Sequence, residues 1–211
     1  TLYNGGSAGI IDAIGDGPTA VVTPTTDTLS IPDATIIREL VINLYNDPPT
    51  GFTYHPYLGD LSCTLTHGGA TVTLFSRVGF RFQNATGKPG DLWSANLYRF
   101  FEGGSGFWNE AYNGGKNGNY LLRSGYYAPS DAQNAASTLA PFVGTSAAGD
   151  WTITFNDYAG FGTTGSFAWS LEINPTSGCC RADFNSSGAV SVQDIFDFLA
   201  AYFTGSLAAD I

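Results

Sequence analysis

The amino-acid sequence predicts an all-β protein whose main body is an antiparallel β-sandwich. Its composition combines 27 glycines with 14% aromatic and only 12% charged residues, a balance typical of strand-rich proteins with many turns. Several short segments alternate apolar and polar residues and end at Gly, Pro or Asp-Pro sequences. Such alternation indicates strands with one face on a core and the other in water.

The chain is expected to begin with an irregular lead-in segment over residues 1–19, followed by the sandwich over 20–174. The lead-in is rich in glycine and other small residues, at Asn4–Ser7 and again at Gly15–Pro18. From Ala20 the pattern changes to short runs of period two, bounded by prolines. The first candidate strands are Ala20–Val22, Leu29–Ile31 and Ile36–Leu44.

Four later segments carry the clearest strand patterns. Leu61–Leu65 and Ala70–Phe75 form a predicted hairpin, with His67–Gly69 at its turn. Trp151–Phe155 and Ser166–Ile173 alternate most regularly, and their tryptophans, Trp151 and Trp169, are expected in the core. Two intervening segments are less regular. Gly103–Gly118 is expected to be an aromatic, glycine-rich loop that serves as a lid or a contact surface, and Ser130–Leu139 a short helix.

A different kind of segment covers residues 175–211 and begins within the linker Asn174–Gly178. Within it, Asp183–Asp194 places oxygen-bearing groups at alternate positions, with Gly188 where the chain must turn sharply. Calcium takes six to eight oxygen ligands, and a 12-residue loop supplies them from positions 1, 3, 5, 7, 9 and 12. Those positions hold Asp183, Asn185, Ser187, Ala189 (through its carbonyl), Ser191 and Asp194.

A helix is expected directly after this loop. Val192, Ile195, Phe196, Leu199, Tyr202 and Phe203 recur at helical spacing, and Thr204-Gly205 is a stop signal. An ordinary polar turn that starts a helix is the alternative to a calcium loop. With Asp183 and Asp194 as its only anionic ligands, the site should be weak, which suits the millimolar calcium outside cells.

The segment resembles the calcium-binding repeat of dockerins, most closely the single-helix form in planctomycete surface proteins. The residues that carry the resemblance are Gly178–Cys180, Ala182–Asn185, Gly188 and Val192–Leu199. Dockerins normally hold two such repeats. Here Ala209–Ile211 echoes only the start of a second one, which is either absent or cut off, so ordinary cohesin binding is not expected.

The body resembles the P domain (Homo B module) that follows the catalytic domain in kexin- and furin-like subtilases. The resemblance covers about residues 20–173 and rests on His55–Leu61, Leu65–Leu74, Phe142–Gly144, Gly149–Ile153 with Asp157, and Gly165–Leu171. It implies a jelly-roll-like β-sandwich that stabilises or positions a neighbour and has no catalytic activity.

The residues themselves also predict that the chain is not an enzyme, with no catalytic residue and no cofactor site other than calcium. Its two histidines, His55 and His67, are accompanied by no Gly-x-Ser-x-Gly sequence, and no subtilase motif is present. Within the resemblance, His55 and Asp60 are expected to hold a loop by hydrogen bonds. Asp60, Asp91 and Asp157 are candidates for a second calcium site.

The net charge excludes several classes of binding partner, and the cysteine content limits the possible disulfides. A net charge of −10 repels nucleic acid and anionic membrane surfaces, and no apolar run approaches the length of about 18 residues that spans a membrane. The three cysteines do not form a disulfide framework. Cys63 either pairs with Cys179 or Cys180, which leaves one thiol over, or all three are unpaired.

These observations predict a secreted or cell-surface protein whose partner is another protein, above all copies of itself. The sequence begins at Thr1 and contains no Met, as expected of a processed secreted chain or, alternatively, of a trimmed one. Three functions are considered. The first is a structural subunit of an extracellular filament or surface layer, and the second is the accessory P domain of a larger secreted subtilisin-like protease. The third is a carbohydrate-binding module that uses the aromatics of residues 103–127, such as Phe107, Trp108, Tyr126 and Tyr127.

Overall fold

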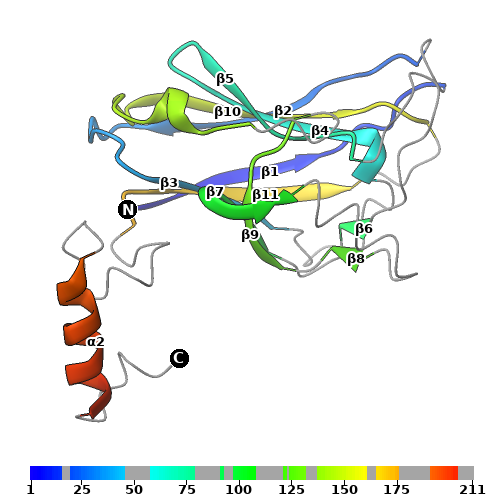
Figure 1. Ribbon diagram of the computed structural model, residues 1–211. Helices are drawn as coiled ribbons and strands as arrows, with labels where there is room; N and C mark the ends of the chain where they lie inside the picture. Colours follow the sequence, from blue (N-terminus) through cyan, green and yellow to red (C-terminus); the bar gives the residue numbers. More distant parts are fainter. Residues whose placement is uncertain are drawn as a thin grey trace.

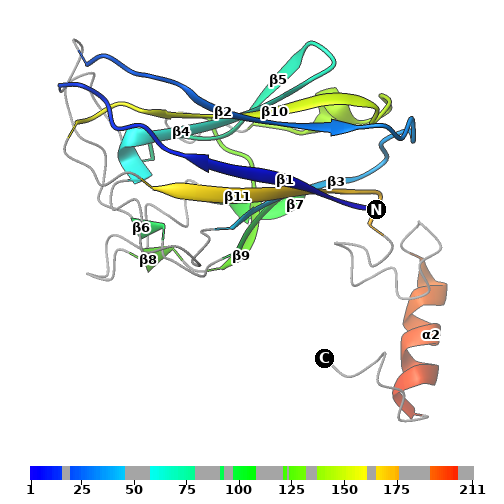
Figure 2. The same cartoon turned by 180° about the vertical axis from the view of Figure 1, so that it is seen from behind.

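The structure is a computed structural model. It describes residues 1–15, 20–45, 58–78, 91–92, 97–107, 121–122, 124–131, 137–160, 165–175 and 191–203. These residues form two stacked β-sheets, and one helix lies beyond them near the C-terminus (Figures 1 and 2). Most of the regular structure is strand, and the sheets are largely antiparallel, so the prediction of an all-β protein with a sandwich-like body is confirmed.

The lower layer in Figure 1 is a five-stranded sheet of order β1-β11-β3-β7-β9. Neighbouring strands are antiparallel except β7 and β9, which run parallel. The strands are β1 (Leu2–Gly9), β3 (Leu40–Tyr45), β7 (Leu97–Gly106), β9 (Gly125–Ala128) and β11 (Ser166–Ile173).

The upper layer is a four-stranded sheet of order β2-β10-β4-β5, antiparallel throughout. Its strands are β2 (Thr25–Ile31), β4 (Leu61–His67), β5 (Ala70–Ser76) and β10 (Gly149–Asp157). The remaining elements are the short parallel pair β6 (Asp91–Leu92) and β8 (Leu121–Leu122), the 3₁₀ turns η2 (Leu58–Asp60) and η5 (Ala140–Phe142), and the helix α2 (Val192–Phe203).

The core lies between the two sheets; β10 contributes alternate residues to it, whereas the central strand β3 is buried at five consecutive residues. In β10, Trp151, Ile153 and Phe155 point inward and are almost fully buried, while Thr152 and Thr154 face outward. Across the layer, Trp169 is also buried, so both tryptophans lie in the core as predicted. Burying each such side chain contributes about 1.5–3 kcal/mol, which makes the sandwich the stable part of the molecule.

The N-terminal segment does not have the irregular structure predicted for residues 1–18, because Leu2–Gly9 forms β1 and pairs with β11. Glycine-rich composition was misleading there, since a Cβ on Gly5 would lie 2.4 Å from the Trp169 ring. The predicted glycine-rich loop from Gly103 is wrong at its start for the same reason. Gly104 belongs to β7, and a Cβ there would lie 2.1 Å from the Tyr127 backbone of β9. At both places glycine permits a close approach within the sandwich.

Other strand predictions are confirmed with shifted ends. The segments predicted at 61–65, 70–75, 151–155 and 166–173 correspond to β4, β5, β10 and β11, and those at 29–31 and 36–44 overlap β2 and β3. Val21 forms only an isolated bridge to Ile14. Instead of a helix over Ser130–Leu139, the described residues there lead into η5, and residues 132–136 lie outside the described part.

The two sheets are joined at one side by the Asp27 side chain. Its carboxylate on β2 accepts hydrogen bonds from the backbone N–H of Gly6 on β1 (2.8 Å) and from the Trp169 indole N–H on β11 (2.6 Å). Hydrogen bonds to a charged acceptor are stronger than neutral ones. The N-terminal strand is therefore fixed to both layers of the sandwich.

Candidate calcium loop, terminal helix and sandwich pocket

Asn174 fixes the point at which the C-terminal segment leaves the sandwich. Its side-chain oxygen accepts hydrogen bonds from the backbone N–H groups of Arg38 (2.7 Å) and Glu39 (3.0 Å), and its amide donates to the carbonyl of Ile36 (2.8 Å). The residue has a φ of 45°, a left-handed conformation that Asn tolerates better than most residues. The exit from β11 is therefore held beside the segment that enters β3.

The start of α2 is closed by a reciprocal pair of side chains. The Ser191 hydroxyl accepts a hydrogen bond from the backbone N–H of Gln193 (3.2 Å). In return, the Asp194 carboxylate accepts hydrogen bonds from the backbone N–H (2.7 Å) and the hydroxyl (3.1 Å) of Ser191. This is a capping-box arrangement, and it explains why the predicted helix begins at Val192.

Two of the six predicted calcium ligands can be placed. Asp183, Asn185, Ser187 and Ala189 lie outside the described residues, whereas Ser191 and Asp194 are described. The two side chains converge, with the Ser191 hydroxyl and one Asp194 oxygen 3.1 Å apart. A carboxylate and a hydroxyl at loop positions 12 and 9 fit the oxygen chemistry that calcium requires. The same contacts also fit the alternative, an ordinary helix start.

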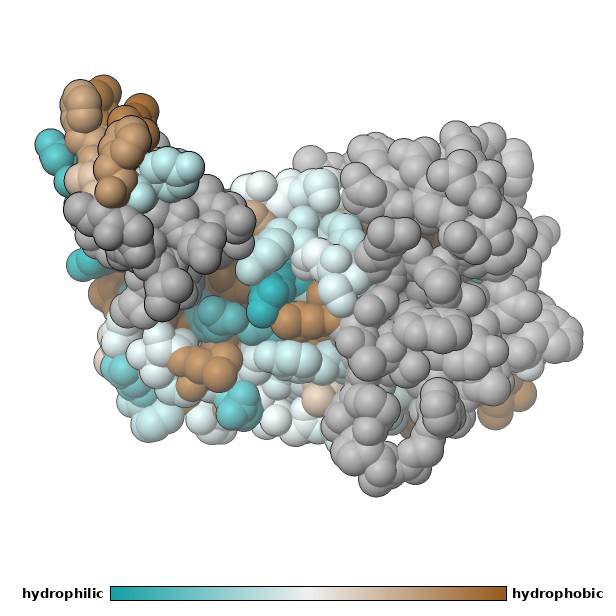
Figure 3. Space-filling model, turned by 90° about the horizontal axis from the view of Figure 1, so that it is seen from below, coloured by the Kyte–Doolittle hydropathy of each residue, from teal (hydrophilic) through white to brown (hydrophobic). Residues whose placement is uncertain are grey.

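The helix α2 exposes an apolar stripe. Its large side chains recur at spacings of three and four residues, and they include Phe203 at 80% exposure, Phe196 at 59% and Ile195 at 58%. The other exposed members are Val192, Leu199 and Tyr202. Brown side chains gather on the projecting helix in Figure 3, and α2 stands apart from the sheets in both ribbon views. The stripe predicted from spacing is present, but it faces outward.

The charged residues of α2 are all acidic. Asp194 and Asp197 lie on it, the Gln193 amide donates a hydrogen bond to the Asp197 carboxylate (2.9 Å), and the helix contains no Lys or Arg. The helix thus combines an apolar stripe with net negative charge.

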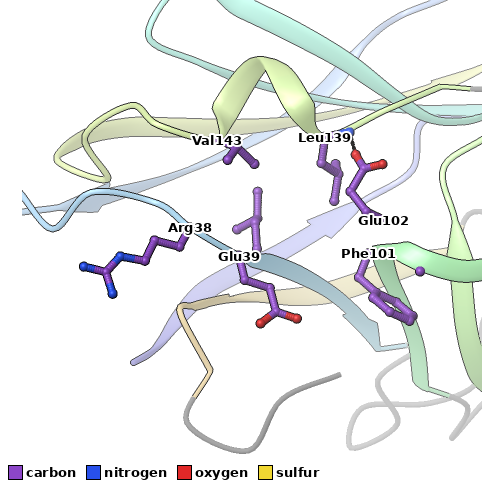
Figure 4. A pocket seen from close by; sticks show the side chains of 8 residues that line it. Arg38, Glu39, Phe101, Glu102, Leu139 and Val143 are labelled. Carbon is purple, nitrogen blue, oxygen red and sulfur yellow. Dashed lines mark hydrogen bonds between the residues drawn. The ribbon is translucent and has the colours of Figure 1, made fainter. Parts of the chain in front are cut away.

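A pocket of about 310 Å³ opens beside η5, where the two layers meet near the start of β3 (Figure 4). Leu40 and Leu139 on its walls are buried, and Val143 at its mouth is 43% exposed. The Glu102 carboxylate accepts hydrogen bonds from the Leu139 N–H and from the Thr138 hydroxyl (2.7 Å). The remaining lining residues are Arg38, Glu39, Phe101 and Gly103.

Asp60, one of the acidic residues predicted for a second calcium site, interacts electrostatically with Arg77. Asp60 and Asp157 are both buried at one end of β4 and β10, and the N–H of Tyr158 donates to the Asp60 carbonyl (3.0 Å). Burial lowers the pKa of the Arg77 guanidinium, and the negative charge of Asp60 opposes that shift. Arg77 therefore supplies positive charge at this end, which the sequence did not indicate. Asp91 lies in β6, and no group of three metal-binding side chains occurs among the described residues.

His67 is a structural residue of the core. Its two ring nitrogens lie 3.0 Å from the carbonyl oxygen of Asp150 and 2.8 Å from that of Ser146. The ring also stacks on Trp151, with the centroids 3.9 Å apart. Both nitrogens are thus directed at backbone carbonyls, and neither is directed at a nucleophile. His55 lies outside the described residues.

Two aromatics predicted as a sugar-binding surface belong to the core. Phe107 and Tyr127 are buried and contact each other edge to face, with ring centroids 5.1 Å apart. Tyr126 is 51% exposed, and the Arg99 guanidinium lies 5.0 Å from its ring centroid. Trp108 lies outside the described residues. Of the aromatics in residues 103–127 that the structure describes, Tyr126 alone has an open ring, and they form no extended stacking platform.

Cys63 is a free, fully buried thiol in β4. Burial raises its pKa well above the ordinary range for a thiol. Cys179 and Cys180 lie outside the described residues. Of the alternatives left by the sequence, a bridge from Cys63 to the C-terminal segment is not formed.

Comparison of the chain with protein-family models, with curated proteins and with solved structures finds no match. Among the helices that the structure describes, none combines the length and the apolar character needed to cross a membrane.

Proposed function

We propose that this chain is a secreted, non-catalytic structural module that assembles with copies of itself through its C-terminal helix. The observation that carries the proposal is the exposed apolar stripe of α2, which includes Phe196, Tyr202 and Phe203. Each of these side chains gains about 1.5–3 kcal/mol on burial, so a partner surface that covers them is strongly favoured.

In this proposal a single calcium ion orders the loop Asp183–Asp194 and thereby fixes the start of α2. The support is the donor chemistry of the loop and the convergence of Ser191 and Asp194 on one another. The ion braces the helix and takes part in no reaction.

The sandwich is the rigid body that the helix extends from. The resemblance to P domains agrees with this proposal, because it implies a jelly-roll-like sandwich that positions a neighbour. The hydrogen bonds of Asn174, which hold the exit of the C-terminal segment against Arg38 and Glu39, support a fixed direction for that segment.

The proposal is tested by sedimentation velocity and electron microscopy of the full chain, with millimolar calcium and with chelator. We expect assemblies larger than the monomer in calcium and their loss in chelator or in Asp183→Ala. Asp131→Ala, which removes an exposed carboxylate elsewhere, is the matched control and should assemble normally. Monodisperse monomers of the wild-type chain under both conditions would refute the assembly function.

A calorimetric test separates calcium binding from assembly. An ion that binds the folded loop alone raises the melting temperature by mass action. We expect chelator to lower the transition temperature of the wild-type chain and to leave that of Asp183→Ala unchanged. An equal response in both proteins would show that the loop does not bind calcium.

A further inference from the structure

We propose that the pocket beside η5 on one copy of the chain receives α2 of a second copy, with an aromatic side chain of the helix entering next to Val143. This inference rests on the proposed function, since it names the surface that covers the exposed stripe of α2. The pocket that binds the helix would then lie at the same end of the sandwich from which its own C-terminal segment departs.

The chemistry of the pocket fits an apolar side chain. Leu40, Leu139 and Val143 contribute aliphatic surface, and the volume of about 310 Å³ lies at the lower end of the range for ligand sites. A large side chain such as that of Phe203, which is 80% exposed on α2, suits a space of this size.

The pocket is also preformed. Glu102 holds the start of η5 through the Leu139 N–H and the Thr138 hydroxyl. At the end of η5, Phe142 packs on the core with its ring centroid 5.2 Å from that of Trp151. Walls fixed in this way lose little conformational entropy when the pocket is filled, which favours binding.

Charge favours the acidic helix as the occupant. Arg38 extends from the mouth of the pocket in Figure 4, and no hydrogen bond or ion pair joins its guanidinium to another described residue. Arg77 and Arg99, in contrast, lie over the rings of tyrosines. The helix carries Asp197 beyond its first turn and no basic residue, whereas Asp194 is buried at the helix start and held by Ser191.

Two carboxylates also line the pocket, and they do not cancel this match. That of Glu102 is occupied by the hydrogen bonds that hold η5, and that of Glu39 points away from η5 in Figure 4. In a chain of net charge −10, most contacts between copies are repulsive. A cation at the mouth of an apolar pocket is therefore a favourable place for an acidic helix to dock.

A second copy is the occupant because one chain leaves both surfaces exposed. None of the residues that line the pocket belongs to α2, whose apolar stripe is exposed, so the helix and the pocket are each available to a neighbour. A contact between two different surfaces of identical subunits is heterologous, and its repetition produces an open chain of subunits unless the geometry closes a ring. Growth beyond a dimer, into an open filament or a closed ring, is thus a direct consequence of this pairing.

The experiment uses two full-length variants in millimolar calcium. Val143→Asp places a charge at the mouth of the pocket, and Phe203→Ser removes the aromatic from the helix; both positions are exposed, so the fold should be retained. Each variant alone should lose about tenfold or more in association constant and sediment as a monomer. Val21→Asp, an exposed position elsewhere, is the control and should assemble normally.

Mixing the two variants provides the decisive measurement. Each retains one intact half of the contact, so an equimolar mixture should form dimers and stop there. A charge reversal adds a second readout, because Arg38→Glu should weaken assembly and Asp197→Arg should restore it in the double variant.

Each other result overturns the inference in a recognisable way. Assembly of Val143→Asp at wild-type strength would show that α2 binds another surface, for example α2 of a second copy. Failure of the mixture to dimerise, with a wild-type chain that assembles, would show that the helix of one copy does not enter the pocket of another. A wild-type chain that stays monomeric in calcium would instead refute the proposed function itself.

Discussion

The hydrogen bonds of Asn174 predict a specific loss of stability when that side chain is shortened. In Asn174→Ala, the backbone N–H groups of Arg38 and Glu39 and the carbonyl of Ile36 lose their partner. The groups on Arg38 and Ile36 are exposed and regain water, so most of the cost comes from the part-buried N–H of Glu39, at about 1–3 kcal/mol. Holding alanine at a φ of 45° adds about 1–2 kcal/mol.

The expected decrease in the free energy of unfolding is therefore about 2–5 kcal/mol, measured by urea denaturation of the full chain. Two matched variants separate the contributions. Asn174→Gly loses the hydrogen bonds without the backbone strain and should be less destabilised than the alanine variant. Asn174→Asp keeps an acceptor for both N–H groups and should lose least. An alanine variant within 0.5 kcal/mol of wild type, or a glycine variant no more stable than alanine, would refute the reasoning.

Two further predictions concern the N-terminal half. Gly5→Ala places a Cβ 2.4 Å from Trp169 and should lower stability by about 1–3 kcal/mol and alter the near-ultraviolet circular dichroism, whereas Gly9→Ala, with open space around its Cβ, should have little effect. The Thr35 hydroxyl and N–H donate hydrogen bonds to the Asp33 carboxylate and lower its pKa. The ionised carboxylate therefore stabilises the fold at pH values above its unfolded-state pKa, and this stabilisation is lost as the pH falls through the folded-state pKa. An NMR titration should show the shift, and Thr35→Val should raise the Asp33 midpoint; an unchanged midpoint contradicts the assignment.

Much of the sandwich was predictable because several of its strands, β10 above all, alternate apolar and polar residues. In β10, apolar Trp151, Ile153 and Phe155 are separated by Thr152 and Thr154, a pattern that fixes both the strand and its buried face. No local pattern marks β1, because Gly5 is required by a close contact with Trp169, on a strand more than 150 residues away in the chain. Close approach between distant segments leaves no periodic trace in a single sequence.

In the candidate site, too, local patterns were predictable from the sequence and contacts between distant segments were not. The alternating oxygen-bearing residues of the loop and the spacing of the α2 stripe are local patterns, so both could be predicted from the sequence alone. The pocket could not, because it brings together Arg38, Phe101 and Leu139 from separate parts of the chain. Likewise, the aromatic content of Phe107 and Tyr127 did not reveal that both rings are buried against each other.

The buried thiol of Cys63 gives the sandwich an internal reporter of its own opening. A thiol reacts with alkylating reagents as the thiolate, and both burial and the raised pKa suppress that form in the folded chain. With Cys179 and Cys180 replaced by Ser, the rate of labelling at Cys63 would follow the fraction of molecules in which β4 has separated from its neighbours. Native-state protection of the upper sheet can thus be measured without denaturant, before and after assembly.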